Sequence, residues 1–318
     1  MFSDTTKQKK TFSLIESYSY GGQGKIGVEF GPPQIVTHPL FYQFLNKIND
    51  KWTSVIHHKI PLQLSEVKEP IDINGIKNAK VISDIAETVH KMNITTALCS
   101  DLTINFMGDH STGIGTVTSD IDHALLNKHN IIDDDVVVIW IDAHADINTH
   151  ETSHSGNCHG MPLAIATGLY KGEPFNWIKK HFPVQNILYV GLRDVDPGEV
   201  EFIKQHQIPV LQMNSTETEH NDFMNKIQGK RVHISFDVDS ISSEYFPCTG
   251  TPVPNGLTPD YVKDLLSEIN RVSNICKLDI AEFNPKIQPE HKDKCVEIIV
   301  NNILTPVFGV SLNGLSHI

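Results

Sequence analysis

A run of six apolar residues, Val136 to Ile141, constrains the fold of this 318-residue chain more than any other segment. The run is too short to cross a bilayer, which takes about 20 apolar residues. A continuous apolar strand without polar alternation is typical of a parallel sheet that is buried on both faces. Parallel strands need crossover connections, which are usually helices. The segment therefore predicts an α/β fold.

The rest of the chain alternates between strand and helix patterns. Further strand patterns occur at 12–17, 102–107, 186–191, 232–236 and 276–281. Helical spacing occurs at 35–48, 76–92, 113–127, 197–206, 259–270 and 290–303. This rhythm predicts a mainly parallel central sheet with helices on both faces, a three-layer α-β-α arrangement. No repeat or linker marks a boundary, so we expect one domain over 1–318, with tails at about 1–10 and 305–318.

The charge balance limits the partners. Lys plus Arg number 26 and Asp plus Glu 38, so the formal net charge is −12 at pH 7. This balance argues against binding to nucleic acid or to an anionic membrane surface. The first ten residues contain no apolar stretch of the kind found in a secretory signal. Five cysteines without a CxxC pair fit reduced thiols. We therefore expect a cytoplasmic protein.

Potential metal ligands follow one predicted strand after another. The ligands that follow three of these strands are His110, then Asp142, His144 and Asp146 of a DAHAD segment, then Asp237 and Asp239. Ligands of open parallel sheets bind beyond the carboxyl ends of the strands. Alternate side chains of extended backbone share a face, so the three polar side chains of DAHAD point the same way. One binding site at this edge of the sheet is the prediction.

The donor types indicate which metal this site takes. Four carboxylates and two imidazoles favour Mn(II) over metals that prefer thiolates, and none of the five cysteines lies in these segments. Four negative charges match two divalent cations. In a two-metal site a bridging water loses a proton near neutral pH and becomes a nucleophile. The residues therefore predict a binuclear metal site at the carboxyl ends of the strands.

Eight segments, in order, resemble the arginase branch of the ureohydrolase family. They are GQGKIGVEFGP (22–32), GDHS (108–111), DAHADINT (142–149), SGNCHGMPL (155–163), GLRDVDPGE (191–199), SFDVDS (235–240), TGTPVPNGLT (249–258) and LDIAEFNP (278–285). The resemblance covers most of the chain. It implies an eight-stranded arginase-like sheet, a homo-oligomer that is usually a trimer, and the hydrolysis of L-arginine to L-ornithine and urea by a metal-bridging hydroxide.

The resemblance also implies two Mn(II) per subunit. The first ion is expected on His110, Asp142, Asp146 and Asp237. The second is expected on Asp142, His144, Asp237 and Asp239. Asp142 and Asp237 are thus expected to bridge both ions, and Asp146 is counted among the catalytic residues as well as the ligands.

Further roles come from the same resemblance. His159 is expected to shuttle a proton, which suits a side chain that titrates near neutral pH. Glu282 is expected to pair with the substrate guanidinium. The residues expected to bind the amino-acid end are Asn148, Ser153 and Ser155 for the α-carboxylate, and Asp196, assisted by Glu199, for the α-ammonium. Thr251 is expected to line the pocket.

Some features leave alternatives open. Met107 replaces a family glycine, and Ser242–Ser243 replace an Asp-Pro pair, which puts metal affinity in doubt. Asp196 precedes Pro197, so helix capping is a second role for it. Cys158 and Cys248 flank pocket segments and predict sensitivity to thiol reagents, with buried, inert thiols as the alternative.

The Gly-rich segment 22–27 reads as GxGxxG, but we interpret it as a flexible connection and not as a nucleotide site. The rival functions are an agmatinase or other guanidino-substrate ureohydrolase, and a catalytically weak arginine-binding regulatory protein.

Overall fold

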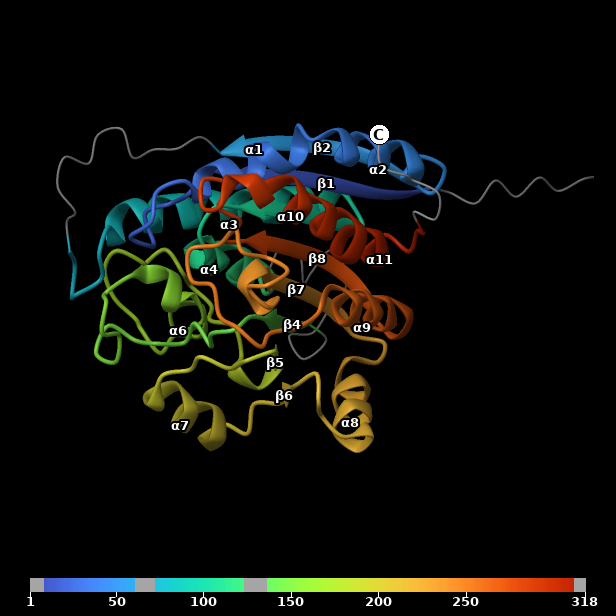
Figure 1. Ribbon diagram of the computed structural model, residues 1–318. Helices are drawn as coiled ribbons and strands as arrows, with labels where there is room; N and C mark the ends of the chain where they lie inside the picture. The colour runs from blue at the N-terminus through green and yellow to red at the C-terminus, as the bar shows by residue number, and fades with distance from the viewer. Residues whose placement is uncertain (1–8, 61–71, 123–135, 312–318) are drawn as a thin grey trace, which may run out of the picture.

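Eight parallel strands form one continuous sheet at the centre of the computed structural model, which describes residues 9–60, 72–122 and 136–311 (Figure 1). The strands are β1 Lys10–Ser17, β2 Trp52–Ile60, β3 Leu102–Met107, β4 Val136–Ile141, β5 Ile187–Val190, β6 Val210–Leu211, β7 Arg231–Asp237 and β8 Asn274–Ala281. They lie in the order β2-β1-β3-β8-β7-β4-β5-β6, and each neighbouring pair is parallel. Their carboxyl ends therefore meet at one edge of the sheet.

Helices cover both faces of this sheet. They are α1 Gly31–Val36, α2 Pro39–Ile48, α3 Ala79–Cys99, α4 Gly113–Ser119, α6 Pro162–Thr167, α7 Pro197–Gln205, α8 Glu217–Ile227, α9 Pro259–Val272, α10 Lys292–Ile298 and α11 Thr305–Val307. Buried side chains of α1, α2, α8, α9 and α10 share one core cluster with the strands. Those of α3, α4 and α6 pack on the opposite face. The three-layer α-β-α arrangement is confirmed. Among the described residues, none of these helices combines the length and the apolar character that a membrane crossing needs.

Strand β4 shows why its apolar run is continuous. All six of its residues are buried. Val137, Ile139 and Ile141 belong to the core cluster on one face. The residues between them point into the cluster on the other face. Because both faces of β4 are covered, no position along it is left for a polar side chain.

The six strands expected from the sequence are confirmed, with ends that shift by two residues or fewer. Strands β2 and β6 were not expected. β2 lies at the sheet edge, where only its first and last residues are buried, and β6 has only two residues. The sheet is also wholly parallel among the described strands, where the expectation was mainly parallel.

Four expected helices differ in extent. The stretch 76–92 starts three residues later and ends seven residues later, as α3. The stretch 35–48 is two helices, because His38 is extended as a residue before proline prefers, and α2 starts at Pro39. The stretch 290–303 starts as α10 and continues as a π-helical segment, Ile299–Leu304. The stretch 113–127 ends its described helix at Ser119, and residues 123–127 lie outside the described residues.

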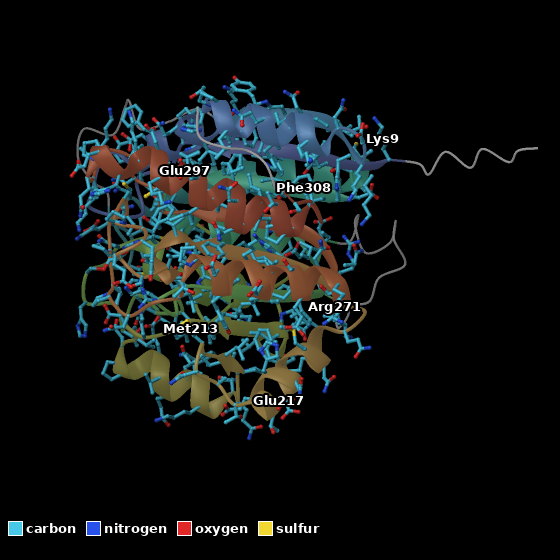
Figure 2. All side chains as sticks on the ribbon, turned by 45° about the vertical axis from the view of Figure 1, so that its right-hand side comes forward. Lys9, Met213, Glu217, Arg271, Glu297 and Phe308 are labelled. Carbon is cyan, nitrogen blue, oxygen red and sulfur yellow. The ribbon has the colours of Figure 1, made fainter. Side chains whose placement is uncertain are left out.

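The expected C-terminal tail starts later than residue 305. Helix α11 is buried, and Phe308, labelled in Figure 2, follows it. The Phe308 ring packs edge-on against Phe12, Phe44 and Trp52, with centroid distances of 5.3, 5.1 and 4.9 Å. These contacts fasten the end of the described chain to β1, α2 and β2.

A buried charged network underlies the middle of the sheet. The Lys277 ammonium on β8 donates to Asp120 at 2.6 Å and is 2% exposed. His233 on β7 lies between Asp120 and Asp279, at 2.6 and 2.8 Å. Burial alone would raise the pKa of Asp120, but the attraction of Lys277 and His233 outweighs it and lowers that pKa to about 2. Asp120 therefore stays ionised, and its contribution to stability is lost only as pH falls from about 4 toward 2.

We expect Lys277→Met to destabilise the fold at pH 7 by about 3–5 kcal/mol, because it leaves the Asp120 carboxylate buried without its cation. The matched control is Lys91→Met, whose exposed ammonium pairs with Glu87 one helical turn away. That control should cost less than about 1 kcal/mol. Denaturant unfolding of both variants and the parent measures these changes. Equal losses of unfolding free energy in Lys277→Met and Lys91→Met would contradict the prediction.

Candidate metal centre

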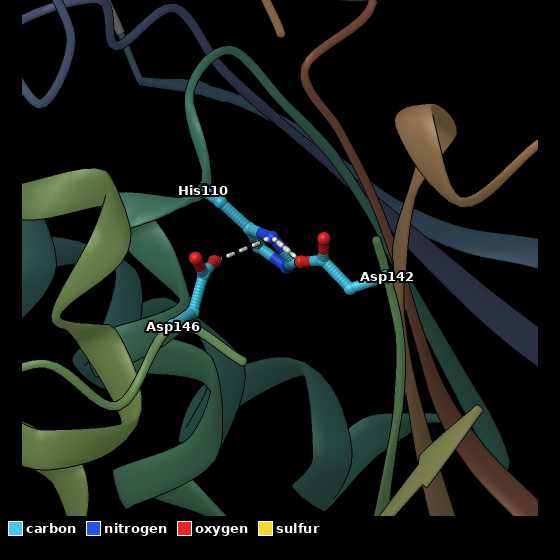
Figure 3. Close-up of side chains that lie close together, drawn as sticks. All are labelled: His110, Asp142 and Asp146. Carbon is cyan, nitrogen blue, oxygen red and sulfur yellow. Dashed lines mark ion pairs between the residues drawn. The ribbon is translucent and has the colours of Figure 1, made fainter. Parts of the chain in front are cut away.

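Three aspartates surround one histidine nitrogen at the carboxyl edge of the sheet. His110 Nδ1 lies 3.2 Å from Asp142, 3.3 Å from Asp146 and 3.3 Å from Asp237. Figure 3 shows the first two of these pairs, with the His110 ring between carboxylates that come from opposite sides. His110 and Asp142 have no exposed surface. The edge therefore gathers four groups from β3, β4 and β7.

A second cluster shares Asp142 with the first. His144 Nδ1 lies 3.4 Å from Asp142 and 3.2 Å from Asp239. The ligand atoms of Asp142, His144 and Asp239 all lie within 4.8 Å of one another, as do those of His110, Asp142 and Asp146. All six residues expected as metal ligands are thus brought together, with Asp142 between the two clusters.

The donor set fits divalent cations. His110 Nδ1 is buried and faces three carboxylates, yet makes no hydrogen bond of acceptable geometry in the described structure. A buried polar atom without a hydrogen bond costs free energy. A cation shared by the nitrogen and the oxygens would remove that cost. Carboxylate and imidazole ligands suit a divalent cation such as Mn(II).

Neighbouring side chains fix the orientation of His110 and Asp142. The His110 ring stacks on Trp140, with centroids 4.0 Å apart and planes 11° apart. Trp140 Nε1 also donates to Asp142 at 2.9 Å. On the other side of the ring, His110 Nε2 lies 2.9 Å from the Ser235 hydroxyl. Such outer contacts set the direction in which the free ring nitrogen points.

The backbone is strained at two site residues. Asp146 has φ 52° and Glu282 has φ 66°, in the left-handed region that side chains rarely adopt. Residues in such regions persist only where their surroundings hold them, and they cluster at functional sites. The Asp146 carboxylate lies 3.3 Å from His110 Nδ1, and the Glu282 carboxylate accepts the His110 backbone N–H at 2.9 Å.

A cavity of about 280 Å³ opens beside the clusters. Its lining includes His159 and all six residues expected around the substrate, namely Asn148, Ser153, Ser155, Asp196, Glu199 and Thr251. Glu282, expected to pair with the guanidinium, is not among the lining residues and lies behind His159, 3.2 Å from its Nδ1. His144, Asp146 and Asp237 lie at the metal end of the same cavity. Thr251 Oγ1 donates to Asp239 at 2.7 Å, so this residue contacts an expected ligand as well as the cavity.

The far end of the cavity carries oriented polar groups. Asn148 donates one amide hydrogen to Asp196 at 2.9 Å and keeps the other. The hydroxyls of Ser153 and Ser155 each accept a backbone N–H, from Gly156 and Asn157, and keep their own hydrogens. This end therefore offers several N–H and O–H donors next to a carboxylate.

Glu199 holds this end of the cavity in place and caps a helix. Its carboxylate accepts N–H groups from Ile147 at 3.0 Å and from Asp196 at 3.1 Å, at the start of α7. Burial raises the pKa of Glu199 to about 7. The capping role foreseen at the Asp196–Pro197 step is confirmed, because Asp196 is the residue that precedes α7.

His159 and Glu282 lie next to each other at the metal end. His159 Nδ1 is 3.2 Å from Glu282 Oε1. Burial alone would lower the pKa of His159, but its hydrogen bond to Glu282 outweighs this and raises the pKa to about 9. His159 therefore carries a proton at neutral pH in the metal-free protein.

Several contributors escaped sequence reasoning. Arg193 uses all five of its N–H donors on backbone carbonyls, two of them from Asp239 and Val253, and so fixes the loop after β7. Backbone hydrogen bonds also hold Ser242 in that loop, where the family has Asp-Pro. Met107 is buried at the end of β3, with 2% of its surface exposed.

The two flanking cysteines are poor targets for thiol reagents. Cys158 and Cys248 have no exposed surface. Burial also raises the pKa of the Cys158 thiol, so little thiolate is present there. This burial argues against the sensitivity that the sequence predicted at these positions.

Comparison with known proteins gives a consistent result. The sequence matches the arginase family over residues 16–304. It is 32% identical to an arginase of Emericella nidulans, over 84% of this chain and 85% of that protein. It is 33% identical to an arginase of Entamoeba histolytica, over 86% and 91%. A crystal structure of an Entamoeba histolytica arginase in complex with L-ornithine matches with a TM-score of 0.80 and 27% identity, over 95% of this chain and all of that one.

We expect Mn(II) binding to release protons and to weaken as pH falls from 8 to 6. Burial opposes the charged form of His110 and His144, but the carboxylates of the surrounding aspartates outweigh it and raise both pKa values in the metal-free protein. A metal binds only the neutral imidazole nitrogen. Calorimetric titration in two buffers with different ionisation enthalpies measures the released protons. A dissociation constant that does not change with pH would contradict this.

Proposed function

Because this chain belongs to the arginase family and is a ureohydrolase, we propose that it hydrolyses L-arginine to L-ornithine and urea with two Mn(II) ions. The observation that carries the proposal is the polarity of the cavity. Histidine and carboxylate clusters stand at one end, and N–H and O–H donors beside a carboxylate stand at the other. An arginine molecule has the matching groups, a guanidinium at one end and an amino acid at the other.

The six clustered residues would hold the ions. His110, Asp146 and Asp142 would bind one, Asp142, His144 and Asp239 the other, and Asp237 would contact both. When bound, the two ions would supply a water molecule that loses its proton near neutral pH and attacks the guanidinium carbon. The four aspartates would balance the charge of the ions.

Glu282 and His159 serve the reacting end in this proposal. A guanidinium is permanently charged and can form two parallel hydrogen bonds with a carboxylate. Glu282 is 1% exposed, so such a pair would be shielded from water. The leaving amine needs a proton, and His159, beside Glu282, is a side chain that can hold and donate one.

The other end of the cavity would select an amino acid. Asn148, Ser153 and Ser155 each retain a hydrogen that can be donated to an α-carboxylate. Asp196 stands beside them and would accept the α-ammonium. Agmatine lacks the α-carboxylate and would leave the three donors without a partner, which a binding site penalises.

Two further proposals concern the setting of the enzyme. All five cysteines are free, which agrees with a reducing compartment, and we propose the cytoplasm. We also propose a homotrimer, on the family resemblance alone. No specific observation in the described structure favours the regulatory alternative.

Replacement of Asp237 by Ala should remove metal and activity together, because this carboxylate is proposed to contact both ions. We expect less than half of the parent Mn content after dialysis, and a loss of turnover of at least about 10³-fold. Elemental analysis and urea release measure the two effects. Full activity of the parent after chelation and removal of metal would refute the metal mechanism.

L-Arginine should be preferred over agmatine by about 10²–10³-fold in kcat/KM. A fully buried site can reject an analogue that lacks a hydrogen-bonding group by about 10⁴-fold, but water can reach the mouth of this cavity, so we expect a smaller preference. Asp196→Ala should lower kcat/KM for arginine while Mn content stays at the parent level, because Asp196 contacts none of the ligands. The same substitution should lower the free energy of unfolding by about 1 kcal/mol, because it removes the N-cap side chain of α7. Comparable turnover of both substrates by the parent would favour an agmatinase.

A further inference from the structure

The Gly-rich segment 22–27 is not a flexible connection. The Gly22 N–H donates to Asp109 at 2.8 Å, and the Gly22 carbonyl accepts the His159 N–H at 3.0 Å. Just before it, the Gly21 carbonyl accepts from Asn78 at 2.9 Å. Further along, the Lys25 ammonium donates to the Gly250 carbonyl. The segment is therefore fastened to the residues beside the metal centre on several sides.

The same segment places one side chain on Glu282. The Gln23 amide Nε2 donates to Glu282 Oε2, and Gln23 is 9% exposed. The other oxygen, Oε1, accepts the His110 backbone N–H at 2.9 Å and lies 3.2 Å from His159 Nδ1. Glu282 thus has three neighbours, of which two are not titratable.

The acceptor positions on the two Glu282 oxygens determine how many hydrogen bonds remain available to a substrate. A carboxylate offers about four acceptor positions, two on each oxygen. Gln23 takes one on Oε2, and the His110 N–H takes one on Oε1, so together they fix the plane of the carboxylate. One position is free on Oε2, and one on Oε1 becomes free when the substrate replaces His159 there. Those two positions form the pair that a planar guanidinium needs.

We propose that Gln23 is a positioning residue, which orients the Glu282 carboxylate for the substrate guanidinium. The proposal rests on the proposed function. A neutral amide suits this role, because a lysine or arginine at position 23 would neutralise the charge that attracts the substrate. The fold also makes room for it, since a Cβ built on Gly250 would lie 2.8 Å from Gln23 Oε1.

The main test is Gln23→Met, which keeps the length of the side chain and removes the donor. A hydrogen bond to a charged group corresponds to about 10–100-fold in an equilibrium constant, so kcat/KM for L-arginine should fall by about that factor. KM should carry most of the loss, because the guanidinium pair exists before the reaction as well as during it. Mn content should match the parent.

Two variants and one ligand separate positioning from a general effect. Gly250→Ala pushes the Gln23 amide aside and should reproduce the loss. Lys25→Met loosens the same segment without touching Glu282, and should stay within about threefold of the parent. L-Norvaline has the amino-acid end of the substrate but no guanidinium, so its dissociation constant should be unchanged in Gln23→Met.

The outcomes are distinct. A parent-like KM in Gln23→Met, an equal loss in Lys25→Met, or a matching loss of L-norvaline binding would each overturn the positioning role while urea release by the parent upholds the proposed function. A parent that releases no urea from L-arginine with Mn(II) would refute the proposed function itself.

Discussion

The mutual repulsion of four aspartates is the constraint on which the rest of the structure depends. Asp142, Asp146, Asp237 and Asp239 are almost completely buried at one edge of the sheet. Burial, together with neighbouring carboxylates, raises the pKa values of Asp146 and Asp237. Such a cluster is stable only if positive charge stands within it. In the metal-free protein the charge comes from histidines with raised pKa values, and in the proposed enzyme it comes from two cations that displace those protons.

The parallel sheet solves the problem of assembly. Every strand delivers its carboxyl end to the same edge, so ligands far apart in the sequence meet without long loops. The loops that complete the site are held in part by hydrogen bonds that do not engage the side chains of the metal ligands. Arg193 uses its donors on backbone carbonyls, Glu199 accepts two backbone N–H groups, and Gln23 binds Glu282 as a neutral amide. Charge near the centre is thus kept for metal and substrate.

The sequence predicted the strands better than it predicted the residues that orient the site. Val136–Ile141 could be placed because a strand buried on both faces has one possible pattern, and the ligands after it follow from the direction of the chain. β2 carries polar residues at a sheet edge, where the pattern is weak. Arg193 and Gln23 act through contacts with residues 46 and 259 positions away, which no local pattern reveals. The Gly-rich segment misled for the same reason, since its contacts are tertiary.

The most direct test of the binuclear account is crystallography of the Mn-loaded protein with X-rays at the manganese absorption edge. We predict two anomalous peaks per subunit about 3.5–4 Å apart, one beside His110 and one beside His144, with Asp142 between them. A single peak, or two peaks too far apart to share Asp142, would contradict the account.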